Sequence, residues 1–143
     1  MPFNLLLIEN SSSDIRLVRE TLADTGEDLT LTVAVDGEEA MRRLRNSAPG
    51  GPMARPDLIL LDLNLPRKDG RAVLKEIKQD PTLTSIPVVV LTASGAEEDI
   101  RSSYESYANC YITKPTDLDS FTRVVEYIEN FWLTKAQTSA LSK

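Results

Sequence analysis

The chain has 143 residues, a formal net charge of −6, one cysteine (Cys110) and no histidine. The missing histidine excludes imidazole-based catalytic pairs, histidine metal ligands and a phosphohistidine on this chain, and a single cysteine excludes an internal disulfide or a thiolate metal cluster. The acidic balance argues against nucleic-acid and anionic-membrane partners, and no apolar run is long enough to span a membrane.

The length of the chain and its first residues predict one cytoplasmic domain. A chain of this size is typical of a single domain. We expect that domain to cover residues 1–134, followed by a polar tail, 135–143, that frays. The first ten residues lack the basic start of a secretory signal peptide.

Five short apolar runs are spaced along the chain. They are Phe3–Ile8, Leu29–Val35, Leu58–Leu61, Val88–Thr92 and Cys110–Thr113. The first, third and fourth are almost continuously apolar, which is typical of parallel strands buried on both faces.

Each apolar run is followed by a segment in which apolar residues recur at helical spacing, mostly behind capping residues. The stripes are Ile15, Val18 and Leu22; Ala40, Met41 and Leu44; Val73 and Ile77; Ile100, Tyr104 and Tyr107; and Leu118, Phe121, Val125, Ile128 and Trp132. The segment Ser47–Pro56, rich in proline and glycine, predicts a loop before the third strand. Five strand–helix repeats predict an α/β fold with one parallel sheet and helices on both faces.

Polar residues gather where the predicted strands end. The carboxyl ends of parallel strands share one edge of a sheet, where the ligands of such folds bind. The residues expected at this edge are Glu9, Asn10, Asp62, Thr92, Ala93 and Lys114. An acid pair, an amide, a hydroxyl and an ammonium group are therefore expected to converge there.

Three segments that carry these residues resemble the receiver domain of bacterial two-component response regulators. They are LILLDLNLPRKDG (residues 58–70), VVVLTAS (88–94) and YITKP (111–115). The resemblance implies a flavodoxin-like (βα)5 three-layer sandwich whose five-stranded parallel sheet has the order 2-1-3-4-5. The run DLNLPRKDG, the loop before the third strand and the ending IENFWL (128–133) are most similar to small single-domain regulators that work with phytochrome-type histidine kinases.

The resemblance implies a phosphoacceptor switch rather than an enzyme. Asp62 would accept a phosphoryl group from the histidine kinase, and the surface of the fourth helix, fifth strand and fifth helix would change in response. Lys114, the Thr92 hydroxyl and the Ala93 N–H would contact phosphoryl oxygens. The Mg²⁺ ligands would be Asp62, Asn10, Glu9 through water and the backbone carbonyl of Asn64. The family also has a cis bond at the position of Lys114–Pro115.

One position departs from the family pattern, which has two adjacent acids after the first strand. Here the pair is Glu9 and Asn10. An amide oxygen can still bind a hard cation, but the cluster loses one negative charge. We therefore expect weaker Mg²⁺ binding than in a receiver with two acids.

The residues that match the switch and output surface are mostly aromatic. Thr92 and Tyr111 match the switch pair, although Tyr111 is equally compatible with a packed core residue. The expected output and dimer surface consists of Tyr104, Tyr107, Val124, Tyr127, Phe131 and Trp132. A last helix that is apolar on two sides predicts a homodimer, and an apolar surface without a partner is the alternative.

Three other functions compete with the phosphoacceptor switch. A haloacid-dehalogenase-type phosphatase needs a second acid two residues after its nucleophile, on the first strand, but Asn64 occupies that place and Asp62 follows the third run. A flavodoxin needs a phosphate-binding loop after its first strand, which Ser11–Ser13 barely resembles. A receiver that serves as an unphosphorylated docking module stays open because of Asn10.

Overall fold

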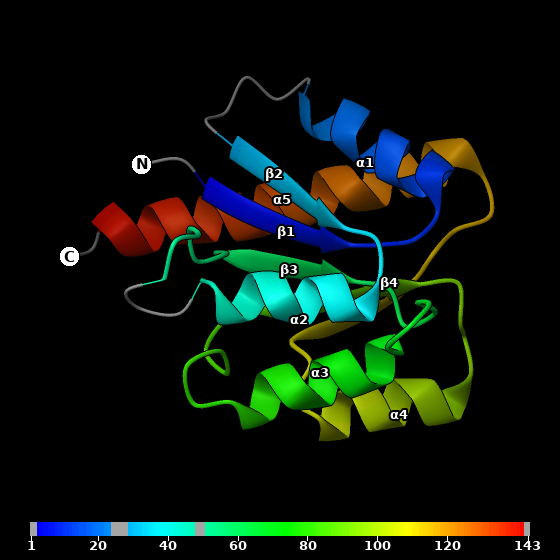
Figure 1. Cartoon of the computed structure of the whole chain (residues 1–143). Helices are drawn as coiled ribbons and strands as arrows, with labels where there is room; N and C mark the ends of the chain where they lie inside the picture. Colours follow the sequence, from blue (N-terminus) through cyan, green and yellow to red (C-terminus); the bar gives the residue numbers. More distant parts are fainter. Residues whose placement is uncertain (1–2, 24–28, 48–50, 142–143) are drawn as a thin grey trace.

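Strands and helices alternate along the chain (Figure 1). The computed structural model describes residues 3–23, 29–47 and 51–141, without the side chains of residues 132–141. The elements are β1 (Phe3–Ile8), α1 (Ser12–Ala23), β2 (Leu29–Ala34), α2 (Gly37–Arg45), β3 (Leu58–Leu61), α3 (Gly70–Gln79), β4 (Val88–Thr92), α4 (Glu97–Glu105), β5 (Cys110–Thr113) and α5 (Leu118–Leu141). The predicted (βα)5 alternation is therefore confirmed.

The strands form one parallel sheet in the order β2-β1-β3-β4-β5. This is the predicted flavodoxin-like order, in which the chain reverses its direction of winding between β1 and β3. Ile8 of β1 is paired with Leu61 of β3, so these two strands end at the same level. The residues that follow them are therefore delivered side by side.

Two apolar cores cover the two faces of the sheet because alternate strand residues point to opposite sides. On one face, Leu6, Ile8, Ile59 and Leu61 pack with residues of α2 and α3. On the other face, the intervening leucines of β1 and β3 pack with Val18 of α1 and with residues of α5. Figure 1 shows α1 and α5 on one side of the sheet and α2, α3 and α4 on the other, which is the expected three-layer arrangement.

Side-chain caps begin four of the helices as their sequences predict. The Ser11 hydroxyl accepts the Asp14 N–H at 3.3 Å, and Asp36 accepts the Glu39 N–H at 2.8 Å. Asp69 and Asp117 cap α3 and α5 by accepting backbone N–H groups two and three residues ahead. These bonds satisfy helix N–H groups that have no partner within the helix.

The fourth helix differs from its prediction. Its only buried side chain is that of Ser103, and Tyr104 is 49% exposed. Tyr107 lies beyond the end of α4, with φ of 67° and 77% exposure. The expected stripe of Ile100, Tyr104 and Tyr107 is therefore not a buried helix face, because the short helix ends before its last member.

The last helix also differs from its prediction. It continues to Leu141, through most of the polar segment that was expected to fray. That segment contains lysine, alanine, glutamine and leucine and no proline or glycine, a composition that favours helix. No helix in the part of the chain that the structure describes is long and apolar enough to cross a membrane.

Candidate functional site

The carboxyl edge of the sheet brings together most of the residues that the sequence places there. Glu9 and Asp62 follow β1 and β3 and are 3% and 7% exposed, while Thr92 is fully buried at the end of β4. The β3–α3 loop folds closely over this edge: a Cβ atom on Gly70 would lie 2.2 Å from the backbone oxygen of Asp62. Only glycine permits that approach, so Gly70 helps to hold the carboxylate of Asp62 in place.

The ammonium group of Lys114 is surrounded by three carboxylates. Its Nζ donates to Glu9 Oε1 at 2.5 Å, to Asp14 Oδ2 at 2.7 Å and to Asp62 Oδ2 at 3.1 Å. The Lys114 side chain is only 8% exposed. Burial by itself lowers the pKa of Lys114, but the bonds to Asp14 and Glu9 outweigh it and keep the pKa above its usual range. Lys114 is therefore a fixed positive charge beside Asp62.

The second oxygen of Asp62 accepts two further hydrogen bonds. The Thr92 hydroxyl donates to Asp62 Oδ1 at 2.6 Å, and the Asn64 N–H donates to the same atom at 3.1 Å. The Asn64 amide also lies 3.5 Å from the Thr92 hydroxyl. Each carboxylate oxygen thus has its own partners, which orients Asp62 at the edge of the sheet.

Glu9 and Asp62 have opposite shifts in pKa. Burial and the nearby Asp62 carboxylate raise the pKa of Glu9 from 4.5 to about 7. Burial alone would raise the pKa of Asp62, but hydrogen bonds from Glu9, Thr92 and Asn64 outweigh it and lower that pKa. Asp62 is therefore ionised near neutral pH, whereas Glu9 is partly protonated there.

The oxygen donors at the edge are suited to a hard divalent cation. Glu9 and Asp62 are two buried acids whose carboxylates both contact Lys114. Asn10 is exposed, and its N–H donates to Glu9 Oε2 at 3.1 Å. The described residues contain no group of three or more acidic, histidine or cysteine side chains placed to hold a metal.

Sequence reasoning missed the role of Asp14. Its side chain reaches Lys114 from the first turn of α1, across 100 positions of the sequence. Ser11–Asp14 was interpreted only as the capping segment of α1. An acid in a first helical turn is also favoured by the helix dipole, so the sequence contained no separate signal for this contact.

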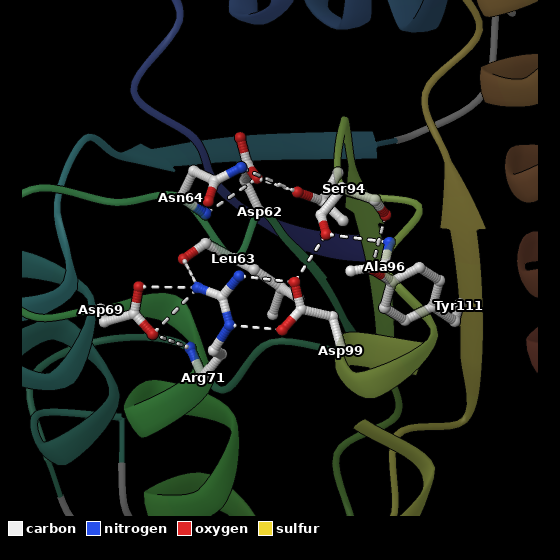
Figure 2. Close-up of polar contacts among 10 residues, drawn as sticks. Asp62, Leu63, Asn64, Asp69, Arg71, Ser94, Ala96, Asp99 and Tyr111 are labelled. Carbon is white, nitrogen blue, oxygen red and sulfur yellow. Dashed lines mark hydrogen bonds and ion pairs between the residues drawn. The ribbon is translucent and has the colours of Figure 1, made fainter. Parts of the chain in front are cut away.

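A second polar cluster, also missed, lies beside Asp62 and Asn64 (Figure 2). The guanidinium of Arg71 binds both oxygens of Asp99, at 2.7 and 2.6 Å, and the Ser94 hydroxyl donates to Asp99 Oδ2 at 2.6 Å. The Tyr111 hydroxyl donates to the Ser94 carbonyl at 2.7 Å. The ion pair with Arg71 lowers the pKa of Asp99 to about 2. The cluster connects α3, the β4–α4 loop, α4 and β5.

The expectations for the Ala93 N–H and for the Lys114–Pro115 peptide bond have different outcomes. Ala93 directly follows Thr92 and is exposed, so its N–H is at the predicted edge. The Lys114–Pro115 bond, expected to be cis, is trans, since the described residues contain no cis peptide bond.

The expected output surface is largely exposed. Tyr127 is 64% and Phe131 47% exposed, and their rings stack with centroids 6.1 Å apart. Val124 instead packs partly against the core on the α1–α5 side of the sheet, so it contributes less to this surface than predicted. Tyr104 accepts the Tyr111 N–H on its hydroxyl at 3.1 Å. The side chain of Trp132 lies outside the described residues.

Comparison with known proteins gives the family. The model of the response regulator receiver domain matches residues 5–126. The response regulator Rcp1 of Synechocystis sp. is 50% identical over 132 residues, which cover 92% of this chain and 90% of Rcp1.

Solved structures agree with this assignment. The phosphorylated cyanobacterial phytochrome response regulator RcpA has a TM-score of 0.89 and 49% identity, covering 94% of this chain and 96% of RcpA. The Mn²⁺-bound form of Rcp1 has a TM-score of 0.86 and 50% identity, covering 92% of this chain and 95% of that structure. The chain belongs to the response regulator receiver domain family.

Proposed function

We propose that this protein is a phosphoacceptor switch that takes a phosphoryl group from a histidine kinase onto Asp62. The observation that carries the proposal is the placement of the Asp62 carboxylate, with Lys114 on one oxygen and Thr92 on the other. The lowered pKa keeps Asp62 ionised and nucleophilic. The chain itself supplies no histidine, so the phosphohistidine belongs to the kinase, and this protein performs no catalysis beyond its own phosphorylation and dephosphorylation.

The transfer requires in-line approach and charge neutralisation more than covalent chemistry from the protein. An Asp62 oxygen forms a bond to phosphorus while the bond between phosphorus and the kinase imidazole breaks. Lys114 keeps its proton and faces one phosphoryl oxygen, and the Thr92 hydroxyl and Ala93 N–H can donate to another. The product is an aspartyl phosphate at the edge of the sheet.

We propose Mg²⁺ as the cofactor of this site, which Asp62, Asn10 and the backbone carbonyl of Asn64 would hold directly and Glu9 would hold through water. These are hard oxygen donors, and Mg²⁺ usually keeps several waters and needs few protein ligands. When bound, the ion neutralises the charge on the phosphoryl group. The structure of Rcp1 with Mn²⁺ supports a divalent cation in this family.

The test of this function is phosphorylation by a small donor. With acetyl phosphate and Mg²⁺, we expect the wild-type chain to gain one phosphoryl group by intact-mass measurement and Asp62→Asn to gain none. Asp119→Asn, which changes an exposed acid on α5, is the matched control and should react as wild type. A wild-type chain that stays unmodified under all conditions would favour the unphosphorylated docking module instead.

The amide at position 10 is expected to weaken Mg²⁺ binding. Asn10→Asp restores a second acid beside Glu9, and an added carboxylate ligand should tighten Mg²⁺ binding by about tenfold. Isothermal titration calorimetry of Mg²⁺ into wild type and Asn10→Asp measures this directly. Equal affinities for the two proteins would show that position 10 does not limit metal binding.

The switch is carried by Thr92 and Tyr111. Phosphorylation adds a charge of about −1.5 to −2 at Asp62, which draws the Thr92 hydroxyl from the carboxylate to the phosphoryl group. The β4–α4 loop that follows Thr92 contains Ser94, whose carbonyl accepts the Tyr111 hydroxyl. A movement of this loop therefore reaches Tyr111 and, through its N–H, Tyr104 on α4.

The partner we propose is a phytochrome-type histidine kinase. Support comes from the similarity to RcpA, a cyanobacterial phytochrome response regulator, over nearly the full length of both chains.

The exposed aromatic residues of α4, of the turn that follows it and of α5 favour a homodimer. Tyr104, Tyr107, Tyr127 and Phe131 each leave much of their side chains in solvent, and exposed aromatic residues commonly anchor interfaces. Light scattering at tens of micromolar (about the range in which weak dimers form) should give a dimer mass for wild type and a monomer mass for Phe131→Ala/Trp132→Ala. Val35→Ala, at an exposed residue just after β2, serves as the control. A monomeric wild type would contradict the dimer.

A further inference from the structure

Lys114 donates a hydrogen bond to one carboxylate, that of Asp14, which is not among the expected metal ligands. Its Nζ donates to Glu9, Asp62 and Asp14. An ammonium group has three hydrogens, so these three carboxylates use all of them. Glu9 and Asp62 follow strands at the edge of the sheet, whereas Asp14 belongs to α1.

A divalent cation and Lys114 compete for the same two acids. Both carry positive charge, and both are attracted to the carboxylates of Glu9 and Asp62. A bound cation therefore weakens the electrostatic attraction between these two acids and the lysine. Asp14 is outside the ligand set, and its side chain is 25% exposed, against 4% for Glu9. Its contact with Lys114 can therefore persist when Glu9 and Asp62 engage a metal.

Asp14 is also held in place independently of Lys114. It lies in the first turn of α1, where its N–H donates to the capping Ser11 hydroxyl. The helix dipole favours a negative charge at this end. A short, charge-assisted bond of 2.7 Å from Lys114 to such a residue restricts the lysine to a small region beside Asp62.

We propose that Asp14 is a positioning residue that keeps the Lys114 ammonium within reach of the phosphoryl group on Asp62 when a divalent cation occupies the acid pair. This inference rests on the proposed phosphoacceptor function and adds a residue to it. During transfer, Lys114 keeps one hydrogen on Asp14, turns another to a phosphoryl oxygen and loses no proton. The bonds that change are those of phosphorus to the donor and to Asp62.

A double-mutant cycle tests whether Asp14 acts through Lys114. The proteins are wild type, Asp14→Asn, Lys114→Met and the double variant, with Glu20→Gln, an exposed acid on α1, as the control. At saturating Mg²⁺, Asp14→Asn should slow phosphorylation by acetyl phosphate about tenfold, because a rate change of that size corresponds to the loss of one charge-assisted hydrogen bond. In the Lys114→Met background the same substitution should change the rate by less than about twofold.

A second measurement needs neither metal nor phosphodonor. In buffer with a chelator, Asp14→Asn should lower the urea midpoint of unfolding in the wild-type background and leave it unchanged in the Lys114→Met background. Equal phosphorylation rates for wild type and Asp14→Asn, or equal effects of Asp14→Asn in both backgrounds, would overturn the role of Asp14 alone. A wild-type chain that accepts no phosphoryl group would overturn both this role and the proposed function.

Discussion

Replacing Lys114 by methionine is expected to lower the free energy of unfolding by about 3 kcal/mol near neutral pH. The substitution keeps the length of the side chain but removes the positive charge that contacts Glu9, Asp14 and Asp62. Two of these acids are more than nine-tenths buried. Removing one member of a buried ion network leaves the others without compensation, which costs far more than losing a surface ion pair.

Urea denaturation in the presence of a chelator measures this effect. Lys75→Met, at an exposed residue of α3, is the matched control and should leave stability within about 0.5 kcal/mol of wild type. The loss should be smaller near pH 5, where Glu9 can take up a proton. A Lys114→Met protein as stable as Lys75→Met would show that the carboxylates find other partners.

The second large effect is a fall in stability as the pH rises. The pKa of Glu9 is raised from 4.5 to about 7 by burial and by Asp62, so the folded chain holds a proton that the unfolded chain has released. Folding is therefore favoured where Glu9 is protonated, and this contribution is lost as the pH rises through about 7. Between about pH 5 and pH 7.5 we expect the unfolding free energy to fall by about 2.5 kcal/mol without metal.

The composition of the chain allows the change in stability over this pH range to be assigned to Glu9. With no histidine, few other side chains titrate between these pH values. Glu9→Gln should remove most of the slope, whereas Glu98→Gln, at an exposed residue, should keep it. Mg²⁺ should restore stability at the upper pH because it binds the deprotonated form. A stability of wild type that does not change over this window would contradict the raised pKa of Glu9.

The strands could be predicted almost residue by residue because each is a short apolar run, and β1, β3 and β4 are almost continuously apolar, as is typical of parallel strands buried on both faces. Only the second run was predicted too long: β2 ends at Ala34, and Val35 is 43% exposed. The residues at the ends of these strands were predicted with them, since parallel strands of known order deliver their carboxyl ends to one edge. Glu9, Asp62, Thr92 and Lys114 therefore came together as expected.

Helix faces were less predictable, because periodicity shows which side of a helix is apolar but not whether anything packs against it. The stripe through Tyr104 and Tyr107 has helical spacing, yet α4 ends at Glu105 and Tyr107 takes a left-handed conformation. Val124 was assigned to an outer face of α5 but packs partly against the core. Both errors concern the ends and edges of elements, where tertiary contacts decide.

The sequence by itself determined the α/β class and the residues that lie at the carboxyl edge of the sheet, because these depend on local apolar pattern and on residues adjacent to strands. The order of the strands came from the resemblance to receiver domains. Tertiary structure alone decided that Asp14 holds Lys114 and that Arg71 holds Asp99, 100 and 28 positions apart. Contacts of this kind join side chains of ordinary surface composition on different helices and loops. Their geometry exists only once the layers of the fold are packed together.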